Sequence, residues 1–331
     1  MANVTREDFS VAAATNASAY RRVTIPVLRI EAGQGPAVAL IAGVHGDEWE
    51  GQAAILYLWH QMPDILQRGT VYLLPAVNAE ASLAGTRLSP SDGGNLNRAF
   101  LGEPARGYTE SIAAALEARL LPRVQAMVDV HSGGASLRYL PSSVITRYGN
   151  DAYDERLPAL ARAFGLPDCV FFRSGEIGSM PAAASRHGVL RLSAEIGGGR
   201  ETSQSLADRC RDGLLGCLAE LGLLTRPAPA HANPARAAEV RLYDMDAPAA
   251  TLRARDSGVF VPAVELGQSV IAHQCIGRLI EPARPDTSPR PLLSPQAGTI
   301  VCLRPIARSD DGDCLLQVAP ALPLDSLASR Y

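Results

Sequence analysis

Short apolar runs alternate with segments of helical periodicity in the first two thirds of the chain, and this alternation limits the possible folds more than any other feature. The apolar runs cover residues 38–42, 71–74, 126–130 and 189–192, and the helical segments lie near 50–60, 110–121, 154–164 and 204–222. Apolar runs of this length between helices are typical of strands that are covered on both faces. We therefore expect an α/β fold with a mixed, largely parallel sheet flanked by helices.

The pattern changes near residue 226. Residues 227–238 are rich in Pro and Ala with little periodicity, which is typical of a linker. Residues 239–331 then carry short β-like pieces between turn sequences such as Asp256-Ser257-Gly258. We predict a catalytic domain over 1–226, a linker over 227–238 and a smaller all-β domain over 239–331.

Two short segments of the predicted C-terminal domain, around Gly258 and Gly298, resemble parts of biotinyl and lipoyl barrel-sandwich domains. The chain contains no Lys, so this domain cannot carry either cofactor. The absence of Lys also excludes Schiff-base catalysis. We expect the domain to cover the catalytic cleft or to form the interface of a homo-oligomer.

Charge and cysteine usage narrow the class of protein further. The net charge is −3, and the 31 basic residues form no run of five or more, so no stripe for nucleic acid or for an anionic membrane surface is visible. No apolar stretch reaches the roughly 18 residues of a membrane span. The six cysteines are scattered without a C-x-x-C pair, which favours reduced structural thiols. We expect a cytoplasmic protein with a small-molecule substrate.

The first polar constellation follows the apolar run 38–42, which leads into His45 and Glu48. This spacing places His45 just beyond a strand and Glu48 in the first turn of the next helix. An imidazole and a carboxylate three residues apart can supply two of the three protein ligands of a catalytic zinc site. The H-x-x-E pattern alone is weak, because a single histidine at a strand end is usually structural.

The second constellation is the end of the run 126–130, which is followed by His131. His131 offers a third metal ligand. Asp129 lies two residues earlier on the same face, where it either orients a ligand imidazole or is a solvated residue at a strand end. Ser132 follows directly, but the chain contains no G-x-S-x-G motif, so we interpret it as a small packing residue.

Two further segments carry polar side chains that suit catalysis and substrate binding. The run 189–192 leads to Glu195 and then to a glycine triplet, which makes Glu195 a candidate general base. The long polar loop 85–100 contains Arg87, Asn97 and Arg98. Guanidinium groups bind carboxylates through two parallel hydrogen bonds, so this loop suits a substrate anion, unless it is simply a solvated basic loop.

Taken in order, H-x-x-E, Asn97-Arg98, D-x-H and Glu195 resemble the zinc carboxypeptidase superfamily and, within it, the succinylglutamate desuccinylase/aspartoacylase family. The resemblance covers roughly residues 36–200 and implies a zinc-carboxypeptidase-like fold. It also implies one Zn²⁺ ion per chain bound by His45, Glu48 and His131, carbonyl polarisation by Arg87, binding of a substrate carboxylate by Asn97 and Arg98, and general-base catalysis by Glu195.

The residues of these motifs are most similar to those of the N-acetyl-diaminobutyrate deacetylase branch of this family. The family's additional substrate contacts have no motif here, and Arg173, Arg191 and Tyr243 are the candidates. The resemblance implies a zinc-dependent hydrolase that cleaves the amide bond of a small N-acyl amino acid. A zinc carboxypeptidase acting on peptides and a non-catalytic binding module on the same fold are the alternatives.

Overall fold

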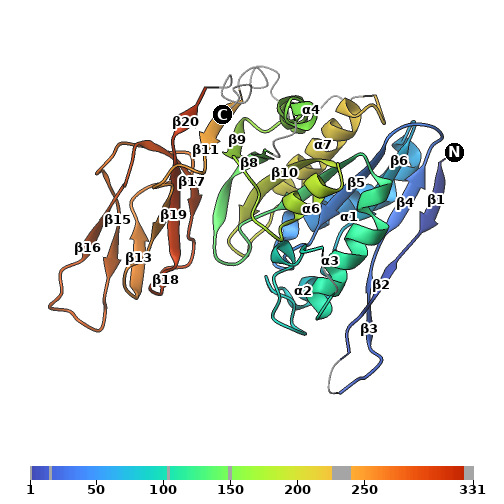
Figure 1. Ribbon diagram of the computed structural model, residues 1–331. Coiled ribbons are helices and arrows are strands. Elements are labelled where there is room, and N and C mark those ends of the chain that lie inside the picture. The colour runs from blue at the N-terminus through green and yellow to red at the C-terminus, as the bar shows by residue number, and fades with distance from the viewer. Residues whose placement is uncertain (1, 15–16, 103–104, 148–150, 226–239, 324–331) are drawn as a thin grey trace.

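The computed structural model describes residues 2–14, 17–102, 105–147, 151–225 and 240–323. Its centre is a mixed sheet in which β5 (Ala37–Ala42), β6 (Thr70–Leu74), β7 (Ala126–His131) and β10 (Leu190–Gly198) are parallel to one another. The strand order is β1-β4-β6-β5-β7-β10-β8. The predicted mixed, largely parallel sheet is therefore confirmed (Figure 1).

The four predicted apolar runs form these parallel strands. Strand β10 begins one residue later than predicted and continues through Glu195 to Gly198, beyond the end of the apolar run. The remaining strands of this part of the chain have no uniform apolar run and were not predicted. They are β1 (Asn3–Arg6), β2 (Phe9–Ala12), β3 (Arg22–Ile25), β4 (Leu28–Glu31), β8 (Arg138–Thr146) and β9 (Asp168–Phe172).

Helices cover both faces of the parallel strands. One face packs against α1 (Trp49–Ile65), α5 (Leu157–Phe164) and α7 (Gln204–Glu220), and the other packs against α3 (Tyr108–Arg119) and α6 (Met180–Arg186). In β5, Val38, Leu40 and Ala42 point to the first face, whereas Ala39 and Ile41 point to the second. Both sets of side chains are buried, which explains why the sequence of this strand is apolar at every position.

Several short helical elements complete this part of the chain. They are α2 (Ala79–Ala84), η1 (Leu96–Arg98), η2 (Leu121–Arg123) and α4 (Asp151–Asp154). The turn η1 lies inside the polar loop that was predicted to bind substrate. The hairpin of β2 and β3 forms a separate small sheet and projects from the body of the molecule (Figure 1).

The C-terminal region is all-β, as predicted, and its described strands pair antiparallel with one another. Its strands are β11 (Arg241–Asp244), β12 (Thr251–Arg253), β13 (Gly258–Pro262), β14 (Ser269–Val270), β15 (Cys275–Ile280), β16 (Arg290–Leu293), β17 (Gly298–Leu303), β18 (Arg308–Ser309), β19 (Cys314–Ala319) and β20 (Ala321–Leu322). One sheet has the order β16-β15-β13-β18. The predicted linker 227–238 lies outside the described residues, so the boundaries at 226 and 239 stay predictions.

The C-terminal region also continues the main sheet, which the sequence did not predict. Strand β17 pairs with β8, where Cys302 lies opposite Tyr139, and β11 pairs in parallel with β9. Figure 1 shows these strands side by side where the two parts of the chain meet. Backbone hydrogen bonds, and not only side-chain contacts, therefore join the two parts.

The cysteines are free thiols, as their scattered spacing predicted. Cys169, Cys210, Cys217 and Cys302 are buried, and Cys275 is exposed. In the described part of the chain, no helix is both long and apolar enough to cross a membrane.

Candidate metal centre and active site

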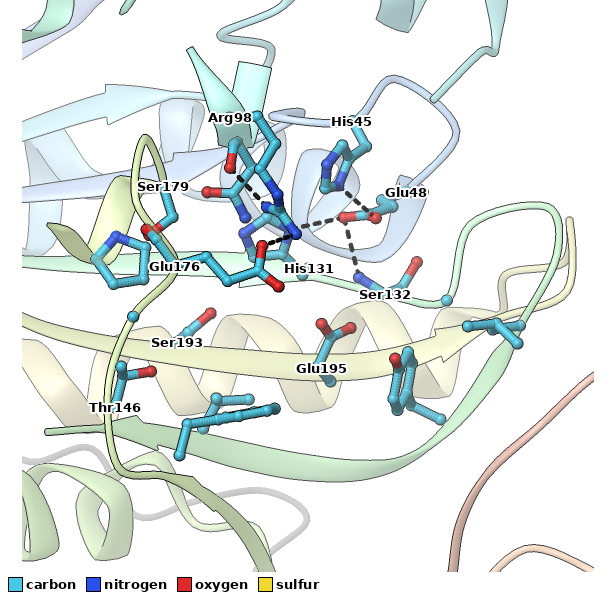
Figure 2. A pocket seen from close by; sticks show the side chains of 18 of the residues that line it. His45, Glu48, Arg98, His131, Ser132, Thr146, Glu176, Ser179, Ser193 and Glu195 are labelled. Carbon is cyan, nitrogen blue, oxygen red and sulfur yellow. Dashed lines mark hydrogen bonds and ion pairs between the residues drawn. The ribbon is translucent and has the colours of Figure 1, made fainter. Parts of the chain in front are cut away.

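A cavity of about 410 Å³ opens at the carboxyl ends of the parallel strands. This is the edge of an open α/β sheet at which ligands are usually bound. All of the described lining residues belong to the segment 45–195 of the sequence. The predicted metal ligands, Arg87, Asn97, Arg98 and Glu195 are all among them, and Figure 2 shows how most of these side chains face one another.

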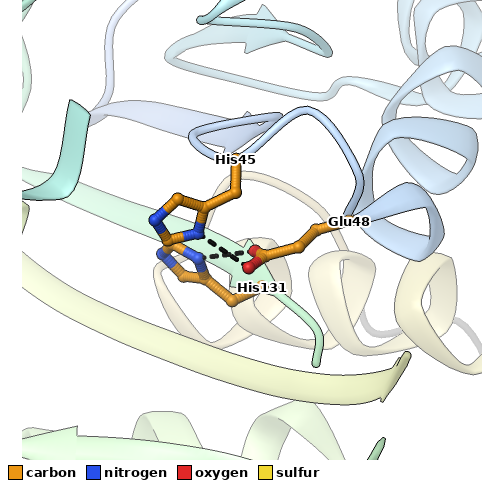
Figure 3. A group of neighbouring side chains, drawn as sticks. All are labelled: His45, Glu48 and His131. Atoms are coloured by element: carbon orange, nitrogen blue, oxygen red, sulfur yellow. Dashed lines mark hydrogen bonds and ion pairs between the residues drawn. The ribbon is translucent and has the colours of Figure 1, made fainter. Parts of the chain in front are cut away.

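His45, Glu48 and His131 converge on one point inside this cavity (Figure 3). The Nδ1 atoms of the two histidines lie 2.7 and 2.8 Å from the two carboxylate oxygens of Glu48. One ligand atom from each residue lies within 4.8 Å of the other two, and all three side chains are buried. Two imidazoles and one carboxylate in this arrangement form a donor set that suits a catalytic zinc ion.

Glu48 lies immediately before α1 and not within its first turn. We expected it in the first turn of α1, but it is the residue that precedes the helix, with extended backbone angles of φ −104° and ψ 92°. The amide of Gln52 donates hydrogen bonds to the carbonyl oxygens of Gly46 and Glu48 and so holds this turn. The extended backbone lets the Glu48 side chain reach both histidines.

A second partner fixes the orientation of each histidine ring. The Nε2 atom of His45 lies 3.1 Å from the side-chain oxygen of Asn95, and the Nε2 atom of His131 lies 3.0 Å from Asp129. The guanidinium of Arg191 in turn donates to Asp129 over 2.8 Å. These contacts leave both Nδ1 atoms directed at Glu48 and at the space for a metal.

Asp129 is fully buried, so the interpretation of it as a solvated strand-end residue is wrong. Burial tends to raise the pKa of this carboxyl group, but His131 and Arg191 outweigh burial and hold the pKa well below its usual range. Sequence reasoning missed Asn95. Its only signal was its place in the Asn95-Leu96-Asn97 turn, where the same oxygen accepts a hydrogen bond from the backbone of Asn97.

The charges of the metal-binding group reinforce one another. Burial tends to raise the pKa of Glu48, but the neighbouring His45 and His131 outweigh burial and hold it well below its usual range. Burial tends to lower the pKa of His131, but the carboxylates of Asp129 and Glu48 outweigh burial and raise it well above 6.5. A proton on His131 therefore competes with a metal for the same nitrogen.

Glu195 lies beside His131 on the neighbouring strand, because β10 and β7 pair in parallel with these two residues opposite each other. Its Oε2 atom is shielded from solvent and has no hydrogen-bond partner among the described residues. Burial raises the pKa of Glu195 to about 8. The strand then turns sharply, and the buried Glu50 holds this turn by accepting a hydrogen bond from the backbone of Gly198 over 3.0 Å.

The three residues predicted to contact substrate all line the cavity. The half-exposed guanidinium of Arg87 donates to Glu48 over 3.1 Å. The side-chain oxygen of Asn97 accepts a hydrogen bond from the backbone N–H of Met180 over 2.8 Å. Arg98 forms an ion pair with Glu176. These positions are compatible with the predicted roles, which stay predictions.

The three candidates without a motif have different positions. Arg191 lines the cavity, but the structure places Arg173 and Tyr243 outside its described lining. Arg173 forms an ion pair with Asp244, and the hydroxyl of Tyr243 donates to Asp168. Both therefore help to join β9 to the C-terminal region.

The C-terminal region contributes none of the described lining residues. Its role as a cover of the cleft or as the interface of a homo-oligomer stays a prediction. The region supports the cavity wall from behind, because β17 pairs with β8 and Tyr139 on β8 lines the cavity. The backbone N–H of Ser132 donates to Glu48 over 3.3 Å, and the interpretation of its side chain as a small packing group stays a prediction.

Comparisons with known proteins identify the family of the chain. The sequence model for the succinylglutamate desuccinylase/aspartoacylase catalytic domain matches residues 34–221. The chain is 31% identical over 305 residues to the N-alpha-acetyl-L-2,4-diaminobutyric acid deacetylase of Halomonas elongata, which covers 91% of this chain and 87% of that protein.

Two solved structures resemble the whole chain. The product-bound ectoine utilization protein EutE (DoeB) from Ruegeria pomeroyi has a TM-score of 0.88 at 28% identity, covering 96% of this chain and 95% of its own. A protein from Rhodobacter sphaeroides described as succinylglutamate desuccinylase/aspartoacylase has a TM-score of 0.89 at 30% identity, covering 97% and 96%. The chain belongs to the succinylglutamate desuccinylase/aspartoacylase family.

Proposed function

We propose that this protein is a zinc-dependent deacylase that hydrolyses the amide bond of a small N-acyl amino acid. The observation that carries the proposal is the position of Glu195, whose shielded and unpartnered Oε2 faces the same cavity as the group of His45, Glu48 and His131. A metal-binding group beside a carboxylate of raised pKa is an arrangement for hydrolysis by an activated water.

Zinc bound by His45, Glu48 and His131 would supply Lewis acidity to the water and to the amide carbonyl. Glu195 accepts a proton from the water as the water oxygen bonds to the carbonyl carbon. Glu195 then donates this proton to the amide nitrogen as the carbon–nitrogen bond breaks. The products are a carboxylic acid and a free amine, and Glu195 returns to its starting state.

Two arginines have separate tasks in this proposal. Arg87 reaches the cavity beside Glu48, where its positive charge can stabilise the negative charge that develops on the carbonyl oxygen. Arg98 also lines the cavity and binds the carboxylate of the amino acid. This binding holds the amide at the distance that attack requires.

Cavity size and family relatives favour a small acyl amino acid over a peptide. A cavity of about 410 Å³ is at the small end of the usual range for ligand sites. The relative from Halomonas elongata is named for an N-acetylated diamino acid, which favours acetyl as the acyl group. We therefore place peptide cleavage second.

A substrate panel tests the proposal. Zinc-loaded protein is incubated with N-acetyl, N-succinyl and N-formyl amino acids and with blocked dipeptides, and the released amine is measured. We expect the N-acetyl amino acids to be hydrolysed fastest. Faster cleavage of the dipeptides would favour a carboxypeptidase, and no release from any compound would favour a non-catalytic binding module.

A further inference from the structure

Glu176 is an acidic residue in the cavity that the proposed reaction does not use. It lies in the loop between β9 and α6 and forms an ion pair with Arg98. Figure 2 shows its side chain extending from this loop toward Arg98, with Glu195 on the opposite side of the cavity. A negative charge is thus placed directly beside the guanidinium that we propose binds the substrate carboxylate.

Backbone contacts hold the loop of Glu176 against the segment of Arg98. The side chain of Asn97 accepts from the N–H of Met180 over 2.8 Å, and the N–H of Phe100 donates to the carbonyl of Gly178 over 2.9 Å. Gly178 has φ +78°, and a Cβ atom there would lie 2.6 Å from the carbonyl oxygen of Arg98. The close contact between the loop of Glu176 and the segment of Arg98 therefore determines the position of Glu176.

Among the residues that the structure describes, the acidic ones that line the cavity are Glu48, Glu176 and Glu195. Glu48 belongs to the metal-binding group, and Glu195 is the proposed general base. Glu176 is the remaining anion, and its described partner is Arg98. When a substrate carboxylate binds Arg98, Glu176 loses that partner, and an ammonium group on the substrate could replace it.

We propose that Glu176 is a specificity-determining residue, which selects N-acyl amino acids that carry a second, positively charged amine. This inference rests on the proposed deacylase function and refines its substrate class. The carboxylate and the ammonium of the substrate must lie a few bonds apart, because Arg98 and Glu176 are in direct contact. Short N-acyl diamino acids meet this condition, and neutral or acidic N-acyl amino acids do not.

The stability of the fold should not depend on Glu176. Its side chain is 67% exposed and that of Arg98 is 46% exposed, and ion pairs at such exposed positions contribute little to folding. The loop is held by the backbone contacts, which Glu176→Gln leaves in place. A change in selectivity of this variant can therefore be assigned to the lost charge.

A matched pair of substrates tests the inference. Nα-acetyl-2,4-diaminobutyrate and N-acetyl-2-aminobutyrate differ only in the side-chain amine, and the ratio of their kcat/KM values measures its recognition. Wild type should prefer the diamino compound, and Glu176→Gln should lower the ratio about 10-fold. Glu176→Asp keeps the charge and should retain part of the preference.

Glu201→Gln is the control, because Glu201 is an exposed glutamate that pairs with Arg138 and neither residue is among the described cavity lining. The ratio of kcat/KM values in Glu201→Gln should equal that of wild type. Calorimetry with free 2,4-diaminobutyrate and 2-aminobutyrate gives a second readout. Wild type should bind 2,4-diaminobutyrate more tightly, and Glu176→Gln should reduce the difference in affinity. A wild-type ratio near one, or an unchanged ratio in Glu176→Gln, would overturn this inference but not the proposed deacylase function. Failure of zinc-loaded wild type to hydrolyse either compound would overturn the proposed function and this inference together.

Discussion

Burial of Glu195 costs free energy, but it raises the pKa of this carboxyl group into the range that suits a general base. Its Oε2 atom is buried without a partner among the described residues, and burial raises the pKa of Glu195 to about 8. A carboxyl group with such a pKa can accept and return a proton near neutral pH. A solvated glutamate, with a pKa near 4.3, would be a weaker base.

Glu195→Gln should slow turnover by roughly 10² to 10⁴-fold, the usual contribution of general acid-base catalysis. Glutamine has the same shape but cannot accept the proton of the attacking water. The metal content should be unchanged, because Glu195 is not one of the three metal-binding residues. Steady-state kinetics with metal analysis measures both, and turnover close to that of wild type would place the base elsewhere.

The same variant should change how stability depends on pH in the metal-free protein. Between pH 4.5 and about 8 the unfolded chain releases the Glu195 proton while the folded protein keeps it, so wild-type stability falls as pH rises. Glutamine does not titrate. The Tm of Glu195→Gln should therefore exceed that of wild type at pH 8, and the difference should shrink toward pH 4.5. Parallel Tm profiles would show that the folded protein does not retain this proton.

Arg98→Ala should abolish most of the preference for a substrate carboxylate. Because Arg98 is 46% exposed, we expect a loss of about 10- to 100-fold in kcat/KM, below the effect of a fully buried charge. The measurement compares each N-acetyl amino acid with its carboxamide. Arg138→Ala is the control, since Arg138 is similarly exposed but pairs with Glu201. Equal hydrolysis of acid and amide by wild type would exclude this role of Arg98.

Residues at the ends of apolar runs could be predicted from the sequence, as could Arg87 and Arg98 in the long polar loop, but two other loop residues could not. His131 and Glu195 lie at the ends of apolar runs, and parallel strands bring such ends to one edge of a sheet. Asn95 and Glu176 contact His45 and Arg98 from loops with no periodic pattern. Their positions depend on tertiary contacts between segments far apart in the sequence, which no local pattern encodes.

At the scale of elements, the turn at the end of β10 determines where Glu195 points. The pairing of β10 with β8 shifts register between Glu195 and Gly197. Gly198 then adopts φ +110°, a conformation that residues with a side chain rarely adopt. The glycine triplet after Glu195 suits this turn, but the sequence did not predict β8, whose first four residues are only partly buried and include Pro141.

Gly198→Ala should lower the free energy of unfolding by about 2 to 4 kcal/mol. The added Cβ atom would lie 2.4 Å from the carbonyl oxygen of Leu137 and 2.6 Å from the backbone of Gly133, so the turn must shift. Gly165→Ala is the matched control, because Gly165 has φ +84° with no atom within 4 Å, and about 1 kcal/mol is expected. Denaturant unfolding measures both, and equal losses would show that the close contacts at Gly198 are unimportant.

For the molecule as a whole, the sequence predicted two parts but not the way in which they are joined. A buried cluster contains Val144 and Val170 from the first part and Tyr243, Val301 and Ala319 from the C-terminal region. Val144 also lines the cavity. The pairing of β8 with β17 could not be predicted, because strands far apart in the sequence pair through contacts that neither strand reveals alone.

Val301→Asp should destabilise both parts together, because it places an unpaired charge in this shared cluster. We expect a loss of several kcal/mol and a parallel loss of enzymatic activity on heating. Val261→Asp is the control, since Val261 is 43% exposed, and it should change Tm little. An unchanged temperature of inactivation in Val301→Asp would show that the C-terminal region does not support the active site.

Zinc titration of metal-stripped protein tests the central claim most directly. The rate of amine release from an N-acetyl amino acid is measured while zinc is added from zero to two equivalents per chain. The rate should rise from near zero and stop rising at one equivalent, and His131→Ala should show no such break, because it lacks one of the three ligands. Full activity of the stripped protein, or wild-type activation of His131→Ala at one equivalent, would contradict a zinc centre at His45, Glu48 and His131.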